Sequence, residues 1–353
     1  MCGIIGYIGK QEAVPILIHG LKKLEYRGYD SSGVGVIPAV AEDRKIILRK
    51  INGKIRSLED LIKANPFPSS FIGISHTRWA THGVPNRTNA HPHADCTGRI
   101  LLVHNGIIEN YESLKRSLCL KGHKFVSDTD TEVIVHLIEE YHHGDLISAV
   151  RRMIKELKGA FALGIICADE PDTLIAARVG SPLIIGLGHG ENFIASDVPA
   201  ILEYTRKIIY LKDGQMASLT KDRVQVFDFE GKSVRPKIDK VTFDVDAVQK
   251  QGYAHFMLKE IHEQPEVLKT MLRSRLKGGE ICLEGLDLND KALAAVSNII
   301  IVACGTAYHA GMVGRYAIEL LSSIPVAVEF SREFRYREPL LRKKTLVVAI
   351  SQS

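Results

Sequence analysis

The sequence predicts an α+β domain followed by an incomplete α/β domain with a doubly wound parallel sheet. Up to residue 220, short apolar runs of strand length alternate with amphipathic segments of helical spacing. A more polar segment follows, and residues 298–303 then form a near-continuous apolar run typical of a parallel strand buried on both faces. We therefore expect a first domain over 2–220, a linker and connecting helix over 221–285, and a second, truncated domain over 286–353.

Composition excludes several classes of protein. The chain has 353 residues, of which 45% are hydrophobic and 25% charged, the balance of a globular protein in water. No apolar run is long enough for a membrane helix, no secretory signal is visible, and the net charge of +5 is spread out, which argues against nucleic-acid binding. The six cysteines show no CxxC spacing, so we expect reduced thiols in the cytoplasm and no disulfide framework or zinc site.

Periodicity and turn residues assign the elements of the first domain. Helices are expected where apolar residues recur every three or four positions, namely at 11–25, 55–64, 112–121 and from the cap at 127–132 through Tyr141. Strands are expected at 4–8, 34–37, 46–51, 71–75, 100–103, 161–166, 173–177, 183–186, 193–195 and 208–211.

Cys2 is the first candidate for chemistry. If Met1 is removed, Cys2 carries a free α-amino group, with a pKa near ~7.7–8.0, beside a thiol with a pKa near ~8.5. One residue would then supply both a nucleophile and a base, and the apolar strand after it would anchor the chain end. The alternative is an ordinary cysteine that leads into a buried strand.

Residues 76–83 are the stretch densest in functional side chains. Arg78 follows an expected strand and could bind a carboxylate through two parallel hydrogen bonds, although a structural salt bridge is the alternative. Nearby histidines raise the question of a metal, but no HExxH or Cys/His pattern is present. We expect no metal site and assign hydrogen-bonding roles in loops to His76, His82, His91 and His93.

Two further segments could complete an acyl-transfer site. Asn105 and Gly106 are expected in a loop between a strand and a helix, where the Asn105 amide and the Gly106 N–H could form an oxyanion hole. An Asn-Gly hairpin turn is the alternative. Asp130 could accept hydrogen bonds from an ammonium group, and the surrounding segment also suits a helix N-cap.

These motifs, in this order, resemble the class II, N-terminal-nucleophile glutamine amidotransferases over roughly residues 2–220. The resemblance implies a four-layer α/β/β/α sandwich with Cys2 between its sheets. It rests on Cys2-Gly3-Ile4, Arg27-Gly28, residues 76–83, Asn105-Gly106 and residues 129–132.

The resemblance also implies a role for each matching residue. Cys2 would attack the side-chain amide of glutamine, and Asn105 and Gly106 would stabilise the oxyanion. Arg78 would bind the carboxylate of the substrate and Asp130 its α-ammonium group.

Four other residues are given supporting roles by the same resemblance. Thr81 and His82 would line the glutamine site. Trp79 would gate the path of ammonia, and Arg27 would support the loop around the nucleophile.

The second half of the sequence contains a candidate binding site for a sugar phosphate. The strand at 298–303, the small-residue turn 304–307 and a helix at about 308–322 form an arrangement that binds phosphate at a helix N-terminus, although a structural turn is the alternative. Strands are also expected at 326–330 and 345–350. This half resembles the first part of a sugar isomerase domain, in which Ala307 replaces a frequent serine. The positions matching the sugar-phosphate site are Gly305, Thr306, Ser351, Gln352 and Ser353.

Together the two resemblances imply glutamine and fructose 6-phosphate as substrates, with glucosamine 6-phosphate and glutamate as products. They imply no cofactor, no nucleic acid and no membrane, and a homodimer for a full-length parent. Only residues 298–353 represent a domain that should hold roughly 100–150 residues, so we expect this chain to hydrolyse glutamine at most. The alternatives are a stand-alone glutaminase and a phosphosugar-binding regulatory protein without catalysis.

Overall fold

The computed structural model describes residues 2–40, 45–79, 83–242, 253, 255–281 and 290–351. The chain divides into two compact units, residues 1–251 and 252–353.

The first unit contains two sheets that are antiparallel throughout the pairs observed. One sheet has eight strands, in the order β15 (Asp239–Lys240), β11 (Lys207–Tyr210), β9 (Ile184–Leu187), β10 (Asn192–Ala195), β1 (Gly3–Ile8), β4 (Ile72–Arg78), β2 (Ser31–Ile37) and β3 (Ile47–Asn52). The other has seven, in the order β14 (Ser233–Val234), β13 (Val224–Asp228), β12 (Gln215–Leu219), β8 (Leu174–Val179), β7 (Gly159–Cys167), β6 (Ile100–Ile108) and β5 (His93–Ala94).

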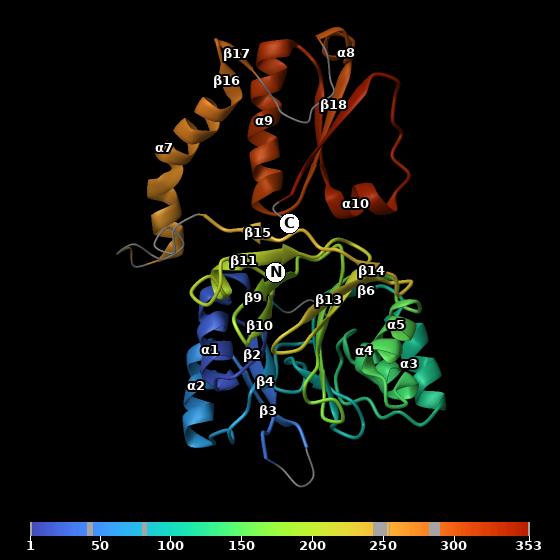
Figure 1. Cartoon of the computed structure of the whole chain (residues 1–353). Helices are drawn as coiled ribbons and strands as arrows, with labels where there is room; N and C mark the ends of the chain where they lie inside the picture. Colours follow the sequence, from blue (N-terminus) through green and yellow to red (C-terminus); the bar gives the residue numbers. More distant parts are fainter. Residues whose placement is uncertain are drawn as a thin grey trace. The chain divides into compact units, whose positions relative to one another are not determined.

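Helices cover the outer faces of both sheets (Figure 1). Two, drawn in blue, pack on the eight-stranded sheet, and three, drawn in green, pack on the seven-stranded sheet. The first pair is α1 (Ala13–Leu24) and α2 (Ile55–Ala64), and the other three are α3 (Tyr111–Leu120), α4 (Glu132–Tyr141) and α5 (Leu146–Ile154). Short 3₁₀ turns lie at Glu25–Arg27 and Val198–Ala200.

Three apolar cores explain this layering. Residues of alternate parity on each strand face opposite sides, so one face of each sheet meets helices and the other meets the second sheet. Ile4 and Ile74 pack against Leu101 and Val103 in the core between the sheets. The predicted four-layer α/β/β/α sandwich is therefore confirmed.

The structure of the first unit differs from the predicted elements in several places. Strand β6 continues through Asn105 and Gly106 to Ile108, because it pairs with β7 along its whole length, so these two residues do not lie in a strand–helix loop. Helix α5 was not predicted. Residues 224–240, expected in the linker, instead add β13, β14 and β15 to the edges of the two sheets.

The second unit is built on a parallel sheet of three strands in the order β19 (Val326–Phe330), β18 (Asn298–Ala303) and β20 (Thr345–Ile350). Strand β18 is buried along Ile299–Ala303, as predicted, and α9 (Thr306–Ser322) connects it to β19. The remaining elements are α7 (Phe256–Arg275), β16 (Leu276–Lys277), β17 (Glu280–Ile281), α8 (Asp290–Ala294) and α10 (Ser331–Tyr336).

The order of these strands creates a switch point. From β18 the chain moves to β19 on one side and then to β20 on the other, so the connections leave the C-terminal end of the sheet in opposite directions. Open α/β sheets bind ligands at this position. Among the described residues of both units, no helix is long and apolar enough to cross a membrane.

Candidate active site

Cys2 directly precedes β1, which lies in the middle of the eight-stranded sheet. Strand β1 runs antiparallel to β4, with Gly3 opposite Thr77, and this register brings Cys2 beside Trp79. The Trp79 N–H lies 3.2 Å from the Cys2 Sγ, and the Sγ lies 3.5 Å from the Trp79 carbonyl oxygen. Strand pairing thus places the thiol at the end of the segment 76–79.

The protonation state of this thiol follows from its surroundings. Burial raises the pKa of Cys2, and the Trp79 N–H and the positive charge of Arg78 only partly oppose that effect. The thiol is therefore mostly protonated at neutral pH, and a base must take its proton before it can attack. An α-amino group on Cys2 would be such a base.

Asn105 reaches Cys2 from the opposite sheet. Its side chain is 6% exposed, and its Nδ2 donates a hydrogen bond of 3.0 Å to the Cys2 carbonyl oxygen. Its Oδ1 lies 3.0 Å from the Nε2 of His76. The amide donor is therefore held against the residue that carries the thiol.

His76 determines which way this amide points. Its Nε2 faces two acceptors, the Asn105 Oδ1 and the carbonyl oxygen of His104 at 3.1 Å, so Nε2 carries the hydrogen. Burial lowers the pKa of His76 to about 3, so the ring is neutral. It stacks on His91 with ring centroids 4.2 Å apart. Sequence reasoning gave His76 a role in loop structure but missed its contact with Asn105, which no local pattern reveals.

Gly106 occupies a position that only glycine suits. Its φ is +140°, and a Cβ there would lie 1.9 Å from the carbonyl oxygen of Ala160 on β7. The close approach of the two strands therefore excludes a side chain beside Asn105.

Arg78 and Asp130 add opposite charges to the site. Each is only 4% exposed. The Arg78 Nη2 donates to the Gly83 carbonyl oxygen at 3.3 Å, and the Asp130 Oδ2 accepts from the Ile108 N–H at 2.8 Å. Burial lowers the pKa of Arg78, while Cys2 and Asp130 act in the opposite direction. Such a pair suits a ligand that carries both a carboxylate and an ammonium group.

Arg27 and Trp79 lie at the margin of this arrangement. Arg27 forms an ion pair of 2.5 Å with Asp197, whose carboxylate also accepts a hydrogen bond of 2.6 Å from Tyr26. Trp79 is 45% exposed, and the ring of Tyr29 meets it edge-on at 5.6 Å. Thr81 and His82 lie outside the described residues.

In the second unit, three of the predicted phosphate-binding residues, Gly305, Thr306 and Ser351, lie at the switch point. Ala303 pairs with Ile350, so the turn after β18 and Ser351 after β20 leave the sheet at the same edge. Gly305, with φ +59°, precedes α9, which begins at Thr306. The Sγ of Cys304 lies 2.7 Å from the Oγ of Ser331, a polar neighbour that sequence reasoning missed although it directly follows β19. Gln352 and Ser353 lie outside the described residues.

Comparisons with known families and solved structures agree with both units. A family model described as a glutamine amidotransferase domain matches residues 76–203, and a SIS domain model matches residues 292–353. The structure of glutamine phosphoribosylpyrophosphate amidotransferase from B. subtilis aligns with 93% of this chain and 65% of its own, with a TM-score of 0.58 and 20% identity. At this identity the likeness shows the fold alone.

Curated relatives match the whole chain. The glutamine–fructose-6-phosphate aminotransferase (isomerizing) of Clostridium tetani is 52% identical over 100% of this chain and 57% of its own length. Proteins of the same name from Aquifex aeolicus and Thermus thermophilus are 49% and 46% identical over 100% of this chain, which covers 58% and 57% of them. The chain is therefore homologous over its whole length to the isomerizing glutamine–fructose-6-phosphate aminotransferases, and it spans a little over half the length of these relatives.

Proposed function

We propose that the first unit hydrolyses glutamine to glutamate and ammonia, with Cys2 as an N-terminal nucleophile after removal of Met1. The observation that carries this proposal is the hydrogen bond of 3.0 Å between the Asn105 amide and Cys2, with Trp79 directly beside the same residue and the positive charge of Arg78 acting on its thiol. The nucleophile thus directly precedes β1, and the oxyanion donor and the carboxylate-binding cation lie on β6 and β4.

Glutamine would be oriented by its charged groups. Arg78 binds its α-carboxylate and Asp130 its α-ammonium group, which directs the side-chain amide toward Cys2. Both protein charges are buried, so their interactions with the substrate are weakly screened and strong. We also propose that Thr81 and His82 contribute to the same site.

The first chemical step forms a thioester. The free α-amino group takes the thiol proton, and the sulfur attacks the side-chain carbonyl carbon of glutamine. The resulting oxyanion accepts hydrogen bonds from the Asn105 Nδ2 and the Gly106 N–H, whose strand is held by β7. The protonated α-amino group of Cys2 then gives this proton to the leaving nitrogen of the substrate amide, and the C–N bond breaks to release ammonia.

The second step returns the enzyme to its starting state. Water attacks the thioester carbonyl with the α-amino group as base, and the C–S bond breaks to give glutamate and the thiol. The same donors stabilise the second oxyanion. Dividing the hydrolysis into two acyl transfers lowers the barrier of each.

For the whole protein we propose the activity that the relatives' names describe, the glutamine-dependent conversion of fructose 6-phosphate to glucosamine 6-phosphate. The second unit supports a sugar-phosphate site at Gly305, Thr306 and Ser351, because the N–H groups at the start of α9 face the switch point of the sheet. Gln352 and Ser353 would complete it. We propose that Trp79 gates the ammonia, that Arg27 supports the loop around the nucleophile, and that the whole protein is a cytoplasmic homodimer.

Glutamate release by the purified chain tests the first proposal. Intact mass must first show that Met1 is absent. We expect Cys2→Ala to abolish turnover, whereas Cys119→Ser, which changes an exposed cysteine on α3, should keep it. Turnover retained by Cys2→Ala, or absent from the processed wild-type chain, would refute the proposal.

A further inference from the structure

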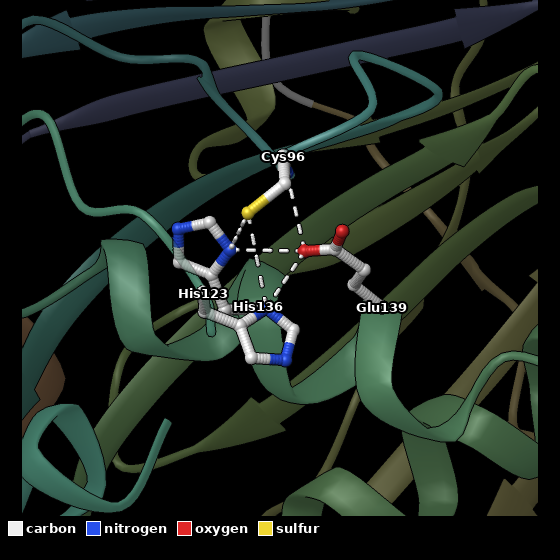
Figure 2. A group of neighbouring side chains, drawn as sticks. All are labelled: Cys96, His123, His136 and Glu139. Carbon is white, nitrogen blue, oxygen red and sulfur yellow. Dashed lines mark hydrogen bonds and ion pairs between the residues drawn. The ribbon is translucent and has the colours of Figure 1, made fainter. Parts of the chain in front are cut away.

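Four side chains gather outside the Cys2 site, around a single point on the outer side of the seven-stranded sheet. They are Cys96, from the turn between β5 and β6, His123, from the segment after α3, and His136 and Glu139, one turn apart on α4. One potential ligand atom from each residue lies within 4.8 Å of the others. Figure 2 shows the sulfur, the two imidazole nitrogens and the carboxylate oxygen turned toward one another.

The separations are those of ligands around one ion. The Glu139 Oε2 lies 3.0 Å from the Nδ1 of His123 and 3.0 Å from the Nδ1 of His136. The Cys96 Sγ lies 3.9 Å and 3.6 Å from the same two nitrogens. Tetrahedral zinc with ordinary bond lengths would place nitrogen and oxygen about 3.4 Å apart and sulfur and nitrogen about 3.6 Å apart.

Both histidines also have the outer partners that metal-bound histidines use. The Nε2 of His123 lies 3.2 Å from the Glu140 carboxylate, and the Nε2 of His136 lies 3.5 Å from that of Glu132. The Glu140 carboxylate holds the Nε2–H form of His123, and the Glu132 carboxylate lies at ion-pair distance from the Nε2 of His136, so the Nδ1 atom of each ring faces the cluster.

Hydrogen bonds alone explain part of this geometry, because each histidine can pair with Glu139. They do not require both Nδ1 atoms to face the same carboxylate oxygen and the same thiol. The described residues contain a second group, His142, Cys167 and Asp169, but it offers three ligands, and Arg99 pairs with Asp169. The four-residue cluster is therefore the stronger candidate.

We propose that Cys96, His123, His136 and Glu139 bind a divalent zinc-type metal ion in a closed structural site. Sulfur, imidazole and carboxylate form a donor set that zinc accepts, and four protein ligands leave no open position for catalysis. The ion would join the β5–β6 turn to α4, with the Cys96 thiol releasing its proton on binding.

Local patterns such as HExxH and CxxC do not detect this cluster, so the sequence-based expectation of no metal site did not take it into account. Here only His136 and Glu139 are local, and Cys96 lies 27 residues from His123 and 40 from His136. Packing of α3 and α4 on one sheet brings them together.

Metal titration of the full chain tests the proposal. After chelator treatment under reducing conditions, we expect the chain to bind about one zinc ion and to give, with cobalt in its place, the near-ultraviolet band of a cysteine thiolate bound to cobalt. Cys96→Ser should remove this band, and Cys119→Ser should leave it. Glu140→Gln, which changes an outer partner only, should weaken zinc binding by roughly 10–100-fold.

Far-ultraviolet circular dichroism of each variant separates loss of ligand from loss of fold. Failure of the folded wild-type chain to bind zinc, or a cobalt band that survives Cys96→Ser, overturns the proposal. A band lost in Cys167→Ser but kept in Cys96→Ser assigns the metal to the other group and overturns it equally.

Discussion

Replacing Asn105 by alanine tests the oxyanion-hole proposal most directly. The change removes one donor from the site, and loss of a single such donor in acyl transfer costs about 2.7–4 kcal/mol of barrier. We therefore expect kcat for glutamine hydrolysis to fall by roughly 10²–10³-fold. The KM for glutamine should change little, because Arg78 and Asp130 remain.

The structure also predicts that this variant folds. Asn105 makes hydrogen bonds of 3.0 Å to Cys2 and 3.0 Å to His76, each worth about 0.5–1.5 kcal/mol, so the free energy of unfolding should fall by about 1–3 kcal/mol. The His76 Nε2–H keeps the carbonyl oxygen of His104 at 3.1 Å, so no buried donor loses its last partner.

A coupled glutamate assay gives kcat and KM, and urea unfolding gives the stability. Asn110→Ala is a matched control, because the Asn110 side chain also makes two hydrogen bonds, both of 2.9 Å, to the main chain at Glu156 and Lys158. We expect it to lose similar stability but to keep its kcat. A kcat for Asn105→Ala within about threefold of wild type would refute the reasoning.

Three further predictions follow from the same structure. Arg78→Lys keeps the positive charge but loses the planar guanidinium that can bind a carboxylate through two hydrogen bonds, so the KM for glutamine should rise roughly 10-fold or more. A change in kcat alone would contradict a role of Arg78 in substrate binding. Gly106→Ala forces a Cβ to within 1.9 Å of Ala160 at φ +140°, so its thermal midpoint and activity should both fall, and an unchanged midpoint would contradict the close strand approach. Burial lowers the folded-state pKa values of His76, to about 3, and of His91. In the unfolded chain the pKa of a histidine is ~6.5, so below this pH the unfolded chain binds more protons than the folded chain does. The free energy of unfolding should therefore fall by about 1.4 kcal/mol per histidine for each pH unit of acidification. Urea midpoints at about pH 7.5 and about pH 5.5 measure this loss, and equal midpoints would disprove it.

Local sequence patterns predicted many of the helices and strands of the first unit. The helices α1 and α2 and most strands appear close to their predicted positions, because amphipathic spacing and alternation are properties of neighbouring residues. The prediction that Asn105 and Gly106 lie in a loop was wrong. The Asn-Gly pair favours a turn, but nine residues of β6 pair with β7 and extend the strand through it.

Local sequence patterns also identified some of the candidate active-site residues. Cys2, Arg78 and Asn105 stand in short segments whose residue types suggest their chemistry, and these segments occur in a recognisable order. Their proximity was an expectation from family resemblance. Strand register explains it physically, since pairing of β1 with β4 places Cys2 beside Trp79.

The sequence by itself determined the fold class, the family resemblance and the residue types available for chemistry, because these depend on composition, local periodicity and ordered motifs. Only the tertiary structure decided which groups meet. The contact of His76 with Asn105 spans 29 positions, and the cluster of Cys96 with His123 and His136 spans 27 and 40. Such contacts arise from the packing of sheets and helices, which brings together residues that no local pattern connects.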